Sequence, residues 1–232
     1  MKKILKVMPV VVGLAAAGDP AAVLAQEADP APKERPMAPE EIAIDIIKKS
    51  TTTVQALKER QRFTQLLREA RGAMIVPEVL KAGFIVGGKG GRGVVMARTE
   101  DGGWSYPAFY RIHAASVGLQ FGVEVAQIAL LIMSEKALDA VLAGDVELGA
   151  GVSVAVGPLG GAGEISTQSD VFTFSINKGA FAGVSFEGAV ISTNEARNEV
   201  FYGQAATAED IVKKGLFKNP AADGLRAALA SK

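Results

Sequence analysis

The chain has 232 residues, 49% hydrophobic and 22% charged, which is the composition of one folded domain with a short tail. Its 25 basic and 25 acidic residues balance, which disfavours nucleic-acid binding because that activity needs clustered lysine and arginine. The absence of cysteine excludes disulfides, thiolate nucleophiles, cysteine-based metal sites and a lipidated N-terminal cysteine.

The first 25 residues have the pattern of a signal peptide. A basic start with Lys2 and Lys3 precedes VMPVVVGLAAAG (7–18), an apolar stretch too short to span a bilayer stably. We predict cleavage after Ala25 and a periplasmic or secreted protein that is not a lipoprotein. The alternative is a disordered cytoplasmic N-terminus.

A proline-rich linker and a helical arm follow. Residues 26–39 contain four prolines and almost no large apolar side chain, so they predict a linker. Apolar residues then recur at helical spacing through 40–71, for example Phe63, Leu66, Leu67 and Ala70. Because threonine is a poor helix former, the run 51–53 predicts two helices or one helix weakened there. Gly72 is predicted to end the arm.

The region 73–191 is a glycine-rich β core. Short apolar stretches broken by glycine predict strands at 73–76, 83–88, 93–98, 108–112, 116–123, 126–133, 146–157, 170–176 and 181–191. A helix is predicted over 134–144, capped by Ser134 and ended by Gly144. Helical segments are predicted over 194–232, one of them from Thr207 to Gly215. We therefore predict a single domain over 40–232.

The stretch GFIVGGKGGRG (83–93) matches two nucleotide-binding patterns by spacing. Gly90 stands where a P-loop carries serine or threonine, so the hydroxyl that binds magnesium is missing. Both patterns also need a helix after the glycines, and the β-branched run 94–98 predicts a strand instead. The sequence thus predicts a hairpin with a glycine turn and no bound nucleotide.

Catalytic and metal chemistry find little support. His113 is the only histidine, and no G-x-S-x-G motif supplies a serine nucleophile for it. One histidine without cysteine makes a zinc site improbable. We expect no enzyme, no catalytic residue, no cofactor and no metal.

Several blocks together resemble one known family. They are ARGAMIVPEVLKAGFIVGGKGGRGVV, GGWSYPAFYRI, SVGLQFGVEVAQIALLIMSEKALD, LGAGVSVAVGPLG, FSINKGAFAGVSFEGAVI and FYG. In this order they resemble the SYLF domain, also known as the Ysc84-type actin- and lipid-binding domain, over about residues 55–215. The chain is similar to the exported bacterial members of that family.

The resemblance implies a non-enzymatic lipid-binding protein of the bacterial envelope. Anionic phospholipid or phosphoinositide-type head groups are the expected partners; the alternative is an envelope structural or stress protein that binds proteins through the same surface. Eukaryotic relatives bind phosphoinositides and, in yeast, actin. An exported bacterial protein does not meet actin, so actin is not expected, and protein partners stay open. Within the matched blocks the basic residues best placed for lipid are Lys81, Lys89, Arg92 and Lys178.

An aromatic segment gives a second candidate contact. Trp104 and Tyr106 lie in a cluster of large rings, which is either core or a belt that meets lipid head groups. Glycine throughout the β core lets strands bend closely. The expected fold is α+β, with an N-terminal helical arm packed on a curved, mainly antiparallel, glycine-rich β-sheet or barrel.

Overall fold

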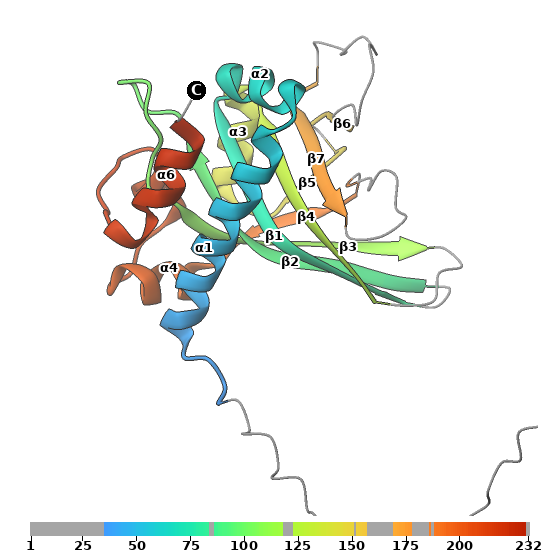
Figure 1. Cartoon of the computed structure of the whole chain (residues 1–232), viewed down its shortest axis with the longest axis horizontal. Helices are drawn as coiled ribbons and strands as arrows, with labels where there is room; N and C mark the ends of the chain where they lie inside the picture. Colours follow the sequence, from blue (N-terminus) through green and yellow to red (C-terminus); the bar gives the residue numbers. More distant parts are fainter. Residues whose placement is uncertain are drawn as a thin grey trace, which may run out of the picture. The chain divides into compact units, whose positions relative to one another are not determined.

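A computed structural model describes residues 35–83, 86–117, 123–150, 152–156, 169–177, 186 and 188–230. The predicted signal peptide and Lys178 lie outside these ranges. The described chain forms an eight-stranded sheet in the order β5-β8-β3-β2-β1-β4-β7-β6, with helices on both faces (Figure 1). The predicted α+β fold is confirmed, because N-terminal helices pack on a curled, mainly antiparallel sheet that forms a half-barrel.

Four long strands form the centre of the sheet: β1 (Gly72–Gly83), β2 (Val86–Ala97), β3 (Ala108–Val117) and β4 (Val123–Ile132). One side is completed by β8 (Val190–Thr193) and β5 (Val146–Glu147), the other by β7 (Val171–Asn177) and β6 (Val154–Val156). All pairings are antiparallel except that of β6 with β7.

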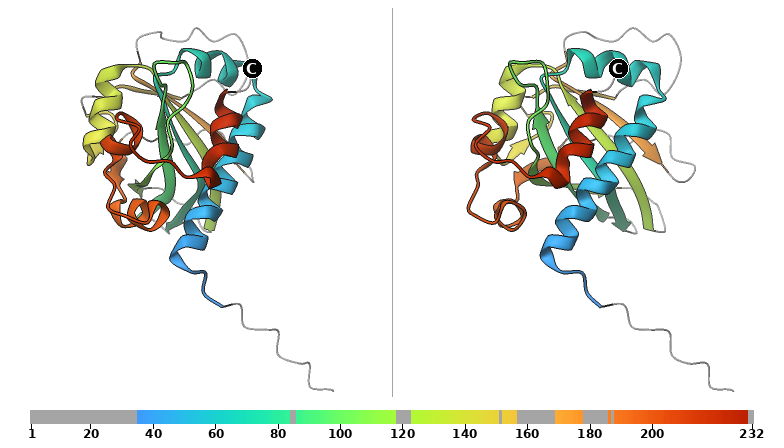
Figure 2. Two further views of the ribbon diagram at one scale, coloured as in Figure 1. Left: turned by 90° about the vertical axis from the view of Figure 1, so that its left-hand side faces the viewer. Right: turned by 60° about the vertical axis from the view of Figure 1, so that its left-hand side comes forward.

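The sheet separates two hydrophobic cores. One face is covered by α1 (Pro39–Lys58), α2 (Gln61–Glu69), α4 (Glu195–Tyr202), the short η2 (Pro220–Ala222) and α6 (Asp223–Ala230). The other face is covered by α3 (Glu135–Ala143) and α5 (Ala208–Val212). Side chains alternate between the two faces of a strand, so Met74 packs with α3 and α5 while Ile75 packs under α1 and α2. Figure 2 shows α1 and α6 side by side over the sheet.

The helical arm is two helices, but the break is not at the threonines. It falls at Glu59 and Arg60, and the run 51–53 lies inside α1. There each threonine hydroxyl donates to the carbonyl four residues earlier, so the polar groups are satisfied within the helix. The prediction for Gly72 was also wrong: α2 ends at Glu69, and Gly72 begins β1.

The glycine-rich stretch after residue 83 is a strand where a turn was predicted. Strands β1 and β2 do form a hairpin, but β2 begins at Val86 and includes the glycines that follow it. These glycines face a bulge in β1 between Ile75 and Glu78, which brings the β1 backbone close to β2. A Cβ on Gly93 would lie 2.2 Å from the Ile75 carbonyl oxygen, and one on Gly91 would lie 2.5 Å from that of Glu78. Glycine is therefore needed inside this strand for close packing.

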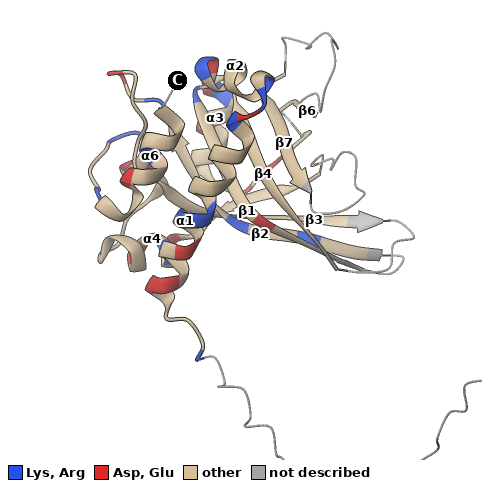
Figure 3. Cartoon of the chain, viewed as in Figure 1, with Lys and Arg blue, Asp and Glu red and all other residues tan. Residues whose placement is uncertain are grey.

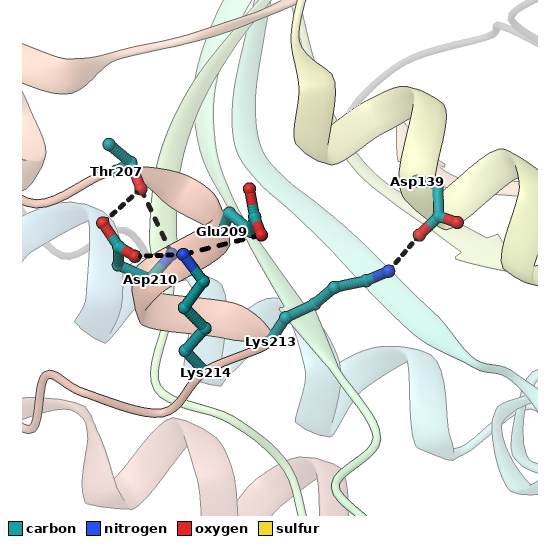
Figure 4. A network of polar contacts seen from close by, with 6 residues as sticks. All are labelled: Asp139, Thr207, Glu209, Asp210, Lys213 and Lys214. Atoms are coloured by element: carbon teal, nitrogen blue, oxygen red, sulfur yellow. Dashed lines mark hydrogen bonds and ion pairs between the residues drawn. The ribbon is translucent and has the colours of Figure 1, made fainter.

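The caps of α3 and α5 are confirmed. The Ser134 hydroxyl accepts from the Ala137 amide at the start of α3, and Gly144 follows its end with a φ of +83°. Thr207 accepts from the Asp210 amide at the start of α5. Lys213, just after α5, bonds Asp139 of α3, so a polar network joins the two helices (Figure 4).

The predicted strand 146–157 is two short strands in different places. Strand β5 pairs with β8, while β6 pairs with β7 at the opposite edge of the sheet. Between them Gly149 has a φ of +94°, a left-handed conformation that ends the first strand.

Candidate functional site

A groove of about 630 Å³ lies between the first half of α1 and strands β1, β2 and β3. This volume is within the range of ordinary ligand sites. Gly90 and Gly91 of β2 line it without side chains. Met37 and Leu80, which are 49% and 50% exposed, add apolar surface to its lining. We name this feature the α1 groove.

Two arginines line the α1 groove, and a third from a distant helix lies near enough to interact with both of them electrostatically. Arg92 and Arg111 both line it and are directly opposite each other in the β2–β3 register. Arg111 also donates to the Asn194 side-chain oxygen at 3.2 Å, just before α4. Arg197 of α4 donates to the Pro39 carbonyl at the start of α1. Burial lowers the pKa of Arg197, and the charges of Arg92 and Arg111 lower it further.

The acidic groups of the α1 groove are already paired with a lysine. The Lys49 ammonium lies 2.8 Å from an Asp45 carboxylate oxygen and 3.0 Å from one of Glu78. Hydrogen bonds to these two carboxylates raise the pKa of Lys49. Figure 3 shows charged residues along β1 and β2 where these strands pass α1. Both carboxylates are ion-paired with Lys49. The charges of Arg92 and Arg111 therefore leave the α1 groove with an excess of positive charge.

The structure places two of the basic residues predicted for lipid on opposite faces of the sheet. Lys89 and Arg92 are three apart in a continuous strand, so their side chains point to opposite faces of the sheet. The Lys89 ammonium lies 4.5 Å from the ring centre of Phe186 in the core on the α3 side, while Arg92 lines the α1 groove. Lys81 is opposite Lys89 in the β1–β2 register, but its side chain, like all of Lys178, lies outside the described part.

The aromatic segment belongs mainly to the core. Trp104 is 1% exposed, and the Arg98 guanidinium stacks 4.4 Å from its ring centre. The Tyr106 hydroxyl donates to an Asp223 carboxylate oxygen at 2.7 Å, which ties the loop before β3 to α6. Of the two alternatives that the sequence left open, Trp104 follows the first, because its ring is enclosed beneath α6 and the neighbouring strands.

Sequence reasoning missed Arg111 and Arg197. Arg111 had a usable signal, because Phe109 and Ile112 fix the alternation of β3 and place Arg111 on the α1 side. Arg197 had no such signal in the sequence. Its position depends on how α4 packs after the chain has passed from β7 on one side of the sheet to β8 on the other.

A second basic groove is chemically less available. It has about 640 Å³ and is lined in part by Arg68, Arg71 and Arg98. Arg98 donates to the carbonyls of Leu67 and Gly102 and stacks on Trp104. Arg71 lies 3.8 Å from Glu135. In this second groove, Arg98 and Arg71 already interact with other groups of the protein, so the α1 groove is the stronger candidate.

The described residues offer little other chemistry. Among them no group of three or more His, Cys, Asp or Glu side chains is placed to hold a metal ion. None of their helices combines the length and apolar character needed to cross a bilayer. His113 is exposed and lines the α1 groove beside Gly90.

Fold and site together define an α+β domain with a basic groove beside its N-terminal helix. The chain belongs to the Ysc84 family, whose model, described as "Las17-binding protein actin regulator", matches residues 113–232. This agrees with the resemblance to the SYLF domain.

Three of its relatives are eukaryotic proteins that are longer than this chain. Protein YSC84 of Saccharomyces cerevisiae is 38% identical over 174 residues, which are 72% of this chain and 37% of that protein. LAS seventeen-binding protein 3 of the same yeast is 36% identical over 174 residues, 72% of this chain and 38% of its own. Human SH3 domain-containing YSC84-like protein 1 is 37% identical over 152 residues, 63% of this chain and 44% of its own. The chain thus spans less than half the length of these relatives, and no solved structure matches it.

These comparisons correct one expectation. Actin was excluded as a partner on the argument that an exported bacterial protein does not meet it. The matching family is described as an actin regulator, and a relative is named for binding Las17. The exclusion of actin was therefore wrong, and protein partners are implicated for this family.

Proposed function

We propose that this chain is a non-enzymatic binding domain that acts on actin or on a protein that regulates actin. The observation that carries the proposal is the family match over 113–232, with 36–38% identity to yeast proteins over 174 residues. The family description names binding and regulation and no reaction, which supports a role without catalysis. The α1 groove supports it physically, because arginine is enriched at protein interfaces.

Co-sedimentation with filamentous actin tests this proposal. The full chain is mixed with increasing concentrations of filaments and centrifuged. We expect saturable recovery of the chain in the pellet, with less recovery at high salt because exposed charges are screened beyond about 8 Å at physiological ionic strength. A chain that stays in the supernatant at every actin concentration, and that binds no Las17-type partner in a pull-down, contradicts the proposal.

We propose lipid association as a second function, and the β1–β2 register favours it. Lys81 and Lys89 are directly opposite each other in the β1–β2 register, and Lys81 is also opposite Glu124 in the β1–β4 register, so this end of the hairpin brings two basic residues and one acidic residue together. The remaining positive charge supports contact with an anionic head group. Flotation of the full chain with vesicles of phosphatidylcholine, with and without phosphatidylserine, tests it. Equal recovery with both vesicle types means that the lysines meet no anionic lipid.

We also propose that the chain is exported and cleaved after Ala25. The support is the basic start and the short apolar stretch 7–18. N-terminal sequencing of the protein from an envelope or medium fraction is expected to begin at Gln26. Recovery of an intact Met1 in the cytosolic fraction contradicts export.

A further inference from the structure

We propose that the α1 groove is the docking site for an acidic segment of a partner protein, with Arg92 and Arg111 receiving its carboxylates and Arg197 adding positive charge beside them. The inference rests on the proposed function in one respect, that the chain binds a protein. It adds where the partner docks and what chemistry the docked segment has.

The charge of the α1 groove calls for carboxylates. Arg92 and Arg111 come from adjacent strands at a directly opposed register position, and like charges so placed repel. The Arg92 side chain has no hydrogen bond or ion pair to any other described residue, and the Nε of Arg197 is buried without a hydrogen-bond partner among them. Both nearby carboxylates, Asp45 and Glu78, are held by Lys49. Planar guanidinium groups with free N–H donors match carboxylates in a two-bond geometry.

The shape of the α1 groove favours a chain segment over a flat membrane. Arg92 and Arg111 line a concave space between a helix and the sheet, which a narrow segment enters more readily than a bilayer surface. Apolar side chains share the lining, Met37 and Leu80 being half exposed and Ile42 partly buried. A mixture of arginine and exposed apolar surface is typical of protein interfaces. We therefore commit to an acidic segment that also carries apolar side chains.

A labelled synthetic peptide provides the test. The probe is a short peptide of glutamate and aspartate around two leucines, and its control replaces every carboxylate by the corresponding amide. Fluorescence anisotropy is measured with the full chain. We expect the acidic peptide to bind the wild type at least about tenfold more tightly than its amide control, because only carboxylates can pair with the arginines.

Variants locate the binding. Arg92→Glu/Arg111→Glu reverses two exposed charges and is expected to weaken the acidic peptide by about tenfold or more. The matched control Arg68→Glu/Lys218→Glu makes the same charge change at exposed positions outside the α1 groove and is expected to bind like the wild type. Circular dichroism and melting temperature check that each variant is folded. If Arg111→Glu disturbs the fold, Arg92→Glu alone decides, since the Arg92 side chain has no polar contact within the described chain.

Each outcome supports or overturns the inference. Equal binding of the acidic and amide peptides overturns it, as does unchanged binding by the folded groove variant. Loss of phosphatidylserine vesicle binding in that variant, with peptide binding unchanged, assigns the groove to lipid and also overturns it. The actin co-sedimentation result stands apart: a chain that pellets with actin but binds no acidic peptide keeps the proposed function and loses the inference. A chain that binds the acidic peptide in the α1 groove but does not bind actin keeps the inference and loses the proposed function.

Discussion

Some positions in this sheet need glycine because a side chain there would collide with the neighbouring strand. A Cβ at Gly93 would lie 2.2 Å from the Ile75 carbonyl oxygen and 2.9 Å from the Val76 side chain. At Gly88, five residues earlier in the same strand, a Cβ would have no neighbour within 4 Å. The two glycines share a strand but point to opposite faces of the sheet, and only Gly93 faces the β1 bulge.

Gly93→Ala is expected to lower the free energy of unfolding by about 3 kcal/mol, because the bulge must move to admit the methyl group. Gly88→Ala is the matched control and is expected to change it by less than about 1 kcal/mol, with a gain from the stiffer unfolded chain. Urea denaturation of both variants measures the difference. Similar losses in both variants would mean that the bulge does not dictate the glycine.

Asp170 joins three parts of the chain through one carboxylate. It accepts hydrogen bonds from the Ser134 hydroxyl at 2.6 Å and from the Ser153 amide and hydroxyl at 3.0 and 2.8 Å. These bonds hold the pKa of Asp170 below its usual value. A carboxyl with a lowered folded-state pKa stabilises the fold above its unfolded pKa of about 3.9, and the contribution is lost as the pH falls through the folded pKa.

Asp170→Asn is therefore expected to cost about 1 kcal/mol at pH 7, less than hydrogen bonds to a fully buried charge because solvent screens this one. The difference between wild type and variant should persist at pH 5 and be smaller at pH 3, because the contribution declines once the pH falls below the unfolded pKa of about 3.9 and is lost as it falls through the lowered folded pKa. Urea denaturation at the three pH values measures it. A constant difference across that range would show that the charge is not the source of the stability.

Among the elements, α1 contains neighbouring threonines whose replacement is expected to have opposite effects on stability. Thr52 is exposed, and its replacement by alanine removes only a poor helix former, for a gain of about 0.5 kcal/mol. Thr53 is fully buried, donates to the Lys49 carbonyl and lies 3.4 Å from the Gln127 side-chain oxygen on β4. Thr53→Ala should cost about 1–2 kcal/mol through the cavity and the unpaired groups. Denaturation midpoints of the two variants should move in opposite directions; a shift in the same direction contradicts this assignment.

The elements also show where sequence patterns succeed and fail. Helix ends governed by local chemistry were predictable: Ser134 and Thr207 cap helices because each hydroxyl reaches an amide three residues on. The threonine run and the glycine-rich strand were not, because tertiary packing overrides local preference in both. Thr53 is buried and contacts Gln127 of β4 from within α1, and Gly93 pairs with Tyr110 in the sheet where the β1 bulge leaves no room for a side chain.

At the scale of the whole molecule, the binding surface is assembled from distant segments. The α+β class followed from the order of helical and strand-like stretches, and the family followed from its blocks. The α1 groove did not, because Arg92 and Arg111 meet through the β2–β3 register and Arg197 comes near them only through the strand order that places β8 and α4 beside β3. Strand alternation also separates Lys89 from Arg92, which their closeness in sequence had concealed.

That separation makes the face that meets lipid testable. If the α1 groove binds a protein segment, we expect the face of the hairpin that carries the Lys89 side chain to contact anionic lipid. Basic residues near an anionic membrane contribute about 1 kcal/mol each, so Lys89→Glu should lower affinity for phosphatidylserine vesicles about five- to thirtyfold. Arg92→Glu is the matched control, with the same charge change in the same strand on the opposite face, and should leave affinity within about twofold.

Flotation at two salt concentrations measures both, and the loss in Lys89→Glu should shrink at high salt. Melting temperature must be compared as well, since Lys89 also packs on the Phe186 ring. A loss confined to Arg92→Glu would place the membrane against the α1 groove, and no loss in either variant would remove the hairpin from the lipid contact.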